Sequence, residues 1–227
     1  LYSWPQNPKS LEDVLTDGLK ANGGSWYGNR NEDSLGFNEA EKAILLDSES
    51  VGESDKVEYF SYDIGGALTK GQINLSLRFK TNGDYFGIIL DSGSGQDSST
   101  AALALRMWDY GQIMTGAYPY GETVLGSTLE IEGRGENAFG AWLTAEISAR
   151  PGEKKYSVVV KSQDGKILAE GYNLKMKGNR IRSVVFSHYE DDGTIWGPAT
   201  YVKDINLDYR LIRPELDAQS VKLTDIT

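Results

Sequence analysis

A series of short alternating segments between residues 57 and 211 constrains the fold of this chain more than any other feature. In residues 73–80, INLSLRFK, every second side chain is aliphatic or aromatic and the others are polar. Such alternation is typical of a strand that buries one face and leaves the other in water. After a first strand at 43–47, comparable runs occupy 57–64, 85–91, 101–108, 112–118, 142–149, 156–161, 167–172, 181–188 and 201–211. The pattern predicts an all-β protein, a two-sheet antiparallel sandwich with at most one or two short helices.

Composition agrees with a β protein that has many tight turns, because the chain holds 26 glycines and 13 tyrosines against a single histidine. One short helix is expected, with Ser10 as its N-cap and its end near Gly18. Residues 22–31 have the composition of a loop. Asp164 and Gly165 are expected to supply the positive φ angles of a two-residue hairpin turn.

The net charge of −10 limits the partners that the chain can have. Nucleic acids and anionic membranes attract basic patches, so neither is an expected partner. No apolar run approaches the ~20 residues that span a bilayer, which argues against membrane insertion. The absence of cysteine excludes disulfides, thiolate metal sites and cysteine nucleophiles. A start at Leu1, without a leader pattern, is expected for a matured or excised piece.

Residues 1–212 are expected to form one β-sandwich domain, which suits a chain of 227 residues. Residues 213–227 follow the last strong strand and begin with a break at Pro214. They are expected to be a linker that enters a further module or, alternatively, a final edge strand packed on the domain.

Four segments carry a family resemblance. They are Asp17-Gly18 with Gly24-Ser-Trp26, then residues 86–91, then 141–147 with 155–160 and Asp164-Gly165, and finally 201–207. With these segments the chain resembles the concanavalin-like (laminin-G-like) jelly-roll superfamily, as found in modules of bacterial polysaccharide-degrading proteins. The resemblance implies a secreted or cell-surface bacterial protein with several modules. It specifies architecture better than activity, because members include lectins, glycan-binding modules, hydrolases and lyases.

Residues 101–111 point to a saccharide ligand, because Arg106, Trp108 and Tyr110 alternate there with aliphatic residues. Pyranose rings stack on aromatic side chains, and planar polar groups bind their hydroxyls. The candidate binding residues are Arg106, Trp108, Tyr110, Gln112, Tyr118, Tyr120, His188, Tyr189, Trp196 and Trp26. Pairing of Arg106 with a carboxylate would suit an anionic polysaccharide. Burial remains the alternative for each aromatic, and the expected core aromatics are Trp142, Tyr156, Phe79, Phe86 and Phe186.

Catalytic motifs are weak in this sequence. Glu130, Glu132 and Glu136 lack the spacing that related β-glucanases place on one strand, and two glycines interrupt the segment. His188 beside Tyr189 could supply the base of a lyase, with packing of the histidine as the alternative.

The resemblance also allows a structural calcium ion, since closing-strand acids of related modules bind one. Asp204 is the candidate ligand, with Asp17, Glu39 and Asp47 as partners, although Lys203 stands where the family pattern has an acid. Asp204 could instead cap a turn. No other cofactor is expected.

The favoured function is a non-catalytic carbohydrate-binding module that binds a polysaccharide and targets an attached enzyme or surface protein. A jelly-roll lyase or hydrolase and a structural or adhesive cell-surface module remain as alternatives.

Overall fold

Antiparallel strands dominate the computed structural model, which describes residues 2–17, 25–28, 35–47, 57–81, 85–93, 101–108, 112–116, 123–127, 141–189 and 199–210. The elements are β1 (Tyr2–Ser3), α1 (Leu11–Asp17), β2 (Ser25–Gly28), β3 (Leu35–Asn38), β4 (Ala43–Asp47), β5 (Val57–Leu68), β6 (Ile73–Thr81), β7 (Tyr85–Asp91), β8 (Ala101–Trp108), β9 (Gln112–Gly116), β10 (Thr123–Ser127), β11 (Leu143–Arg150), the 3₁₀ turn Pro151–Glu153, β12 (Lys155–Lys161), β13 (Ile167–Lys175), β14 (Ile181–Tyr189) and β15 (Ala199–Tyr209). The all-β prediction is confirmed.

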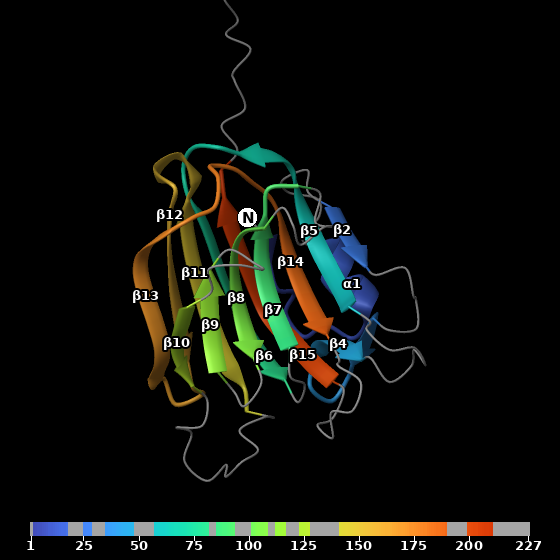
Figure 1. Ribbon diagram of the computed structural model, residues 1–227. Helices are drawn as coiled ribbons and strands as arrows, with labels where there is room; N and C mark the ends of the chain where they lie inside the picture. The colour runs from blue at the N-terminus through green and yellow to red at the C-terminus, as the bar shows by residue number, and fades with distance from the viewer. Residues whose placement is uncertain are drawn as a thin grey trace, which may run out of the picture.

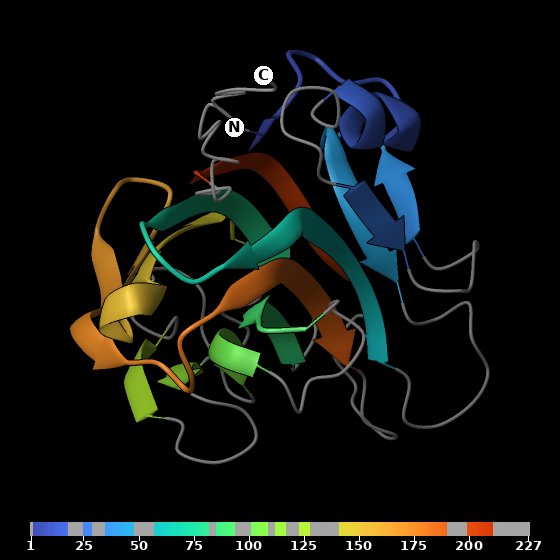
Figure 2. The same ribbon diagram turned by 90° about the horizontal axis from the view of Figure 1, so that it is seen from above.

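The strands form two facing layers, as Figures 1 and 2 show. The hydrogen-bonded order is β2-β5-β14-β7-β8-β9-β10-β13-β12-β11-β6-β15-β4-β3, with β1 beside β15. We call β5, β14, β7, β8 and β9 the front layer and β13, β12, β11, β6 and β15 the back layer. A single register pair, Gly126 with Ala169, joins β10 to β13, where the path passes from one layer to the other.

The main core lies between the layers, and it is filled by the inward-facing apolar side chains of the alternating strands. Burial along β6 alternates as predicted, because Ile73, Leu75, Leu77 and Phe79 are all at most 2% exposed. Four of the five expected core aromatics, Tyr156, Phe79, Phe86 and Phe186, are buried. The fifth expectation is wrong, since Trp142 is only partly buried. It precedes the inward residue Leu143 by one position, so its parity is that of the outward residues of β11.

The N-terminal region packs on one end of this core. α1 begins as predicted, with the Asp13 amide donating to Ser10 Oγ at 3.2 Å, and Val14 is fully buried. Tyr2 Oη donates to the Val14 carbonyl at 2.7 Å, which ties the helix to β1. Residues 25–28, expected as part of a loop, form β2 and pair with β5 instead.

The hairpin between β12 and β13 differs in detail from its prediction. Gly165 has a φ of 87°, but Asp164 is not among the residues with positive φ. The Gly165 amide donates to the Ser162 carbonyl at 3.0 Å, and the Ser162 amide donates to the Lys166 carbonyl at 2.9 Å. These bonds close a three-residue turn, which needs only one left-handed residue.

Candidate functional site

The outward side of the front layer, which we call the front face, holds the predicted residues around Arg106. Strand register arranges this face in successive rows. The row through Arg106 is Tyr59, Ser187, Gly87, Arg106, Met114, and the next is Ser61, Val185, Ile89, Ala104, Gly116. Ile89, Ala104 and Val185 belong to an apolar cluster separate from the main core, with Tyr59 packed on it. The front face is therefore apolar along one row and more polar along the neighbouring one.

Arg106 and Ser187 lie on either side of Gly87. A Cβ atom added to Gly87 would come within 2.9 Å of Ser187 Oγ and 3.7 Å of Arg106 Cγ. The absence of a side chain at Gly87 therefore lets the Ser187 hydroxyl lie close over the backbone, beside the aliphatic stem of Arg106. Arg106 is partly exposed. A partly exposed guanidinium group has the donors that bind vicinal hydroxyls or a carboxylate.

The next positions along these strands bring further predicted residues together in register. Trp108 pairs with Gln112, and Tyr189 pairs with Tyr85. Gln112 is exposed, whereas the side chains of Trp108 and Tyr189 lie outside the described part of the structure. Tyr110, Tyr118, Tyr120 and Trp196 lie outside the described residues altogether. Their roles in binding stay predictions.

Two acidic residues lie at the opposite end of the front face. Asp63 and Asp91 flank Ser183 in register, and they are 4% and 1% exposed. Asp63 accepts from the Gly65 amide at 2.8 Å and from Arg182 Nε at 3.2 Å. Ser183 Oγ donates to the Gly93 carbonyl at 3.0 Å, so the turn after β7 lies against this row. The described contacts of Asp63 are those of a structural carboxylate.

The structure places His188 inside the protein and not at a rim. Its side chain is 0% exposed, and Nδ1 lies 2.9 Å from Thr200 Oγ1. Thr200 Oγ1 lies in turn 2.8 Å from Thr81 Oγ1. This buried polar chain connects β14 of the front layer with β15 and β6 of the back layer. His188 therefore does not meet a ligand on the surface, so its prediction as a binding residue is wrong, and the lyase alternative loses its imidazole base.

Trp26 also differs from its prediction. Its ring lies 5.2 Å from Tyr2, 4.9 Å from Tyr62 and 5.4 Å from Phe60, measured between ring centroids. The indole is partly buried against the main core. Aromatic packing in this cluster, and not stacking on a sugar, is the described role of Trp26.

The expected calcium ligands do not converge in the described part of the chain, where no three acidic or histidine side chains are grouped as metal ligands. Asp204 lies at a bulge in β15, has a φ of 53°, and pairs with Arg78 at 3.5 Å. Glu39 is exposed on a turn, and the side chains of Asp17 and Asp47 lie outside the described residues. Calcium binding therefore stays a prediction.

A group of cations surrounds Trp142 on the outward side of the back layer. Lys203 Nζ lies 3.9 Å from the Trp142 ring centroid, and the Lys80 and Arg78 charges lie 5.1 and 5.4 Å from it. Glu41 accepts from Lys80 Nζ at 2.6 Å and from Trp142 Nε1 at 3.3 Å. Its hydrogen bond to Lys80 holds the pKa of Glu41 below the usual range, while burial and the nearby Arg78 lower the pKa of Lys203.

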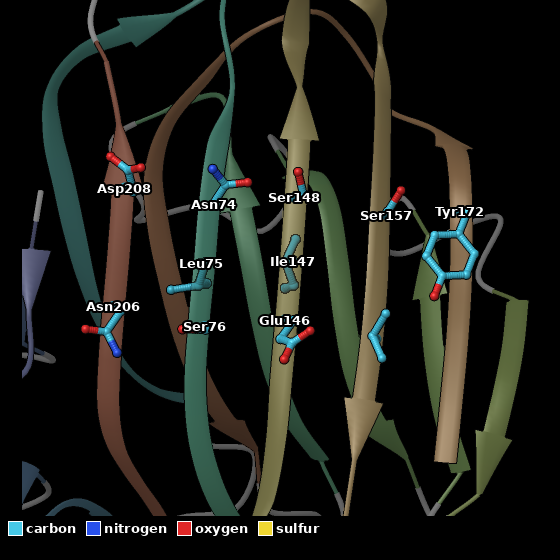
Figure 3. Close-up of a pocket in the computed structure, with 11 residues that line it drawn as sticks. Asn74, Leu75, Ser76, Glu146, Ile147, Ser148, Ser157, Tyr172, Asn206 and Asp208 are labelled. Carbon is cyan, nitrogen blue, oxygen red and sulfur yellow. The ribbon is translucent and has the colours of Figure 1, made fainter. Parts of the chain in front are cut away.

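Two hollows open on this side of the molecule. One, of about 780 Å³, is lined by the N-terminal segment around Trp4 together with Arg78, Lys203 and Asp204. The other, of about 410 Å³, crosses the back layer and is shown in Figure 3. We call it the back groove. Sequence reasoning missed both hollows, although alternation in 73–80 had assigned Asn74, Ser76 and Arg78 to water. The signal that could have found the back groove is the same outward parity of small polar residues on neighbouring strands.

No helix in the described part of the chain is long and apolar enough to cross a membrane. No protein-family model and no curated protein sequence matches the chain. Solved structures do match. Lectin I from Ulex europaeus, in complex with the methyl glycoside of α-L-fucose, is 12% identical, with a TM-score of 0.55 over 90% of this chain and 94% of the lectin. The metal-free lectin I-B4 from Griffonia simplicifolia is 13% identical, with a TM-score of 0.54 over 87% of this chain and 97% of the lectin.

The binding domain of botulinum neurotoxin DC, in complex with rat synaptotagmin II, is 11% identical with a TM-score of 0.56. That match covers 91% of this chain and 47% of the toxin chain. Identities this low show the fold and leave the ligand open. The two plant lectins and the strand order of the sandwich together confirm the resemblance found in the sequence: the chain has the concanavalin-like jelly-roll fold of the legume lectins.

Proposed function

We propose that this chain is a non-catalytic carbohydrate-binding module, which binds an extracellular polysaccharide at the Arg106 end of the front face and holds an attached enzyme or surface protein near it. The observation that carries the proposal is the position of Arg106, a partly exposed arginine on the front face that lies beside Gly87 and Ser187 in register. The Ulex lectin of the same fold, solved with a methyl glycoside, supports a saccharide ligand. Secretion or display on a bacterial surface is part of the same proposal.

Arg106 also supports an acidic polysaccharide as the ligand. The guanidinium binds a carboxylate through two parallel hydrogen bonds, which an ammonium group cannot reproduce. Gln112, exposed at the start of β9, would add an amide for neighbouring hydroxyls. Trp108, paired with Gln112 in register, is the proposed stacking partner of the pyranose ring.

Affinity electrophoresis tests this function with neutral and acidic polysaccharides in the gel. We expect at least one polymer to retard the wild type, and Arg106→Ala to weaken retention by about tenfold, as expected for loss of a hydrogen bond to a charged group. Arg106→Lys should recover only part of the retention. Trp108→Ala should weaken binding as well, whereas Arg210→Ala, which removes an exposed arginine at the end of β15, should not.

Equal retention of the wild type and Arg106→Ala would refute the proposed site. Turnover of a polysaccharide would favour the enzyme alternative. Binding to a cell-surface protein, with no polysaccharide retained, would favour the adhesive alternative.

A further inference from the structure

We propose that the back groove is a second saccharide site, which takes a linear neutral polysaccharide chain lying across the strands of the back layer. This proposal goes beyond the front-face function, because the two sites use opposite layers and share no residue. The groove crosses five neighbouring strands, from β15 through β6, β11 and β12 to β13 (Figure 3).

The groove is built from two rows of residues in register. One row is Asp208, Asn74, Ser148, Ser157, and the other is Asn206, Ser76, Glu146, Val159. Figure 3 shows the labelled side chains of the two rows in two lines across the strands. Neighbouring strands lie about 4.8 Å apart, which is close to the advance per sugar in an extended pyranose chain. Successive sugars of such a chain would therefore meet equivalent positions on successive strands.

Hydrogen bonds within the groove fix which polar atoms face a ligand. Gln72 Nε2 donates to Asn74 Oδ1 at 2.6 Å and to Ser148 Oγ at 2.9 Å. Because its carbonyl oxygen is engaged, Asn74 offers its two Nδ2 donors. Asn206 is oriented the other way, since its Nδ2 donates to the Asp204 carbonyl at 3.1 Å and leaves Oδ1 as an acceptor. Sugar hydroxyls, which both donate and accept, match this combination.

Tyr172 supplies an aromatic surface at the β13 end of the groove. Its side chain is 58% exposed, and it is the one aromatic among the exposed large hydrophobic residues of the described chain. Tyr172 Oη donates to Glu170 Oε2 at 2.9 Å, which holds the ring in one orientation. A fixed, exposed ring beside planar amides is the combination that binds the apolar face of a pyranose.

Charge selects a neutral chain over an acidic one. The residues that line the groove include the carboxylates of Glu146 and Asp208 but no lysine or arginine. Glu146 is paired with Lys161 at 2.7 Å, whereas Asp208 is exposed at the other end. A uronate or sulfate group placed between these acids would be repelled. A neutral polymer would not be repelled, because its hydroxyls can donate hydrogen bonds to these carboxylates.

Two sites on opposite layers give the module the ability to bridge two polysaccharide chains. The closing experiment therefore combines affinity electrophoresis with light scattering of protein mixed with a neutral and an acidic soluble polymer together. The polymers are mixed-linkage β-glucan, galactomannan and xylan, with polygalacturonate as the acidic comparison. Tyr172→Ala is the test variant, and Tyr172→Phe keeps the ring. Ile167→Ala, which removes an exposed side chain from the same strand outside the groove, is the control.

In an Arg106→Ala background, we expect Tyr172→Ala to weaken retention by a neutral polymer by about tenfold. Tyr172→Phe, which keeps the ring and loses only the bond to Glu170, should keep most of the retention, and Ile167→Ala should leave it unchanged. With Arg106 intact, Tyr172→Ala should abolish polymer cross-linking in light scattering while front-face retention persists. The back groove is refuted if Tyr172→Ala changes neither measurement, or if no neutral polymer retards the protein. If Arg106→Ala alone has no effect while Tyr172→Ala does, the front-face function fails and the back groove stands.

Discussion

The buried chain formed by Thr81, Thr200 and His188 allows a quantitative test of the interior. Thr200 Oγ1 makes two hydrogen bonds in this chain, at 2.8 Å to Thr81 and 2.9 Å to His188, and all three residues are at most 4% exposed. Thr200→Val keeps the side-chain shape and removes the hydroxyl that serves both partners. Loss of a buried hydrogen bond costs about 1–2 kcal/mol, so the two together should lower the free energy of unfolding by about 2–4 kcal/mol.

Urea denaturation measures this loss, and with an m-value of about 2–3 kcal/mol/M the midpoint should fall by about 1 M. Thr81→Val breaks one of the two bonds and should cost about half as much, while Thr200→Ser keeps the hydroxyl and should retain most of the stability. Polysaccharide retention should be unchanged in the folded variants, because His188 does not reach the surface. A midpoint for Thr200→Val equal to that of the wild type, or a larger loss in Thr81→Val, would refute the shared role of Thr200.

Three further variants test other parts of the structure. Gly126→Ala would place a methyl group against the Leu168 carbonyl, so it should cost about 2 kcal/mol and speed amide exchange where β10 meets β13. Because the pKa of Glu41 is lowered in the folded protein, its ionised carboxylate stabilises the fold above pH 4.5, and this contribution is lost as the pH falls through the folded-state pKa. Glu41→Gln should therefore lower the free energy of unfolding by at most about 1 kcal/mol at neutral pH and leave it unchanged in acid. Burial raises the pKa of Tyr209, so ionisation of its phenol above pH 10 favours unfolding. Tyr209→Phe should therefore lose less stability in base than the wild type does. An equal loss of stability in the two proteins above pH 10 would contradict the burial of Tyr209.

Period-two alternation was sufficient to predict most of the sandwich. The predicted segments from residue 57 onward correspond to strands, with end points that differ by a few residues, because each has one face on the core. The strand at 43–47 corresponds to β4, whereas β1, β2, β3 and β10 were missed. β2 and β3 are four residues long, which is too short to show a period, and pairing with β5 and β4 determines their structure.

Site residues were harder to predict, because one sequence does not show directly whether a strand residue faces the core or the outside of the sheet. Arg106 was placed on an outward face by alternation, and the structure agrees. Trp142 was assigned to the core from its aliphatic neighbours, although its parity is outward. His188 shares its parity with Phe186, which had been assigned to the core, so alternation alone could have placed the histidine inside. The back groove depends on register between five strands, which no local pattern contains.

The position of β15 has a consequence for how the chain folds during synthesis. β15 is the last described strand, yet it lies between β6 and β4 and also pairs with β1. Until residue 209 has left the ribosome, the outer edges of β4 and β6 lack their common neighbour, so the back layer stays divided. The nascent chain must then protect two unpaired strand edges from association with other chains, and folding that depends on such distant segments is slow. Dependence on chaperones during translation should therefore be greatest just before β15 emerges.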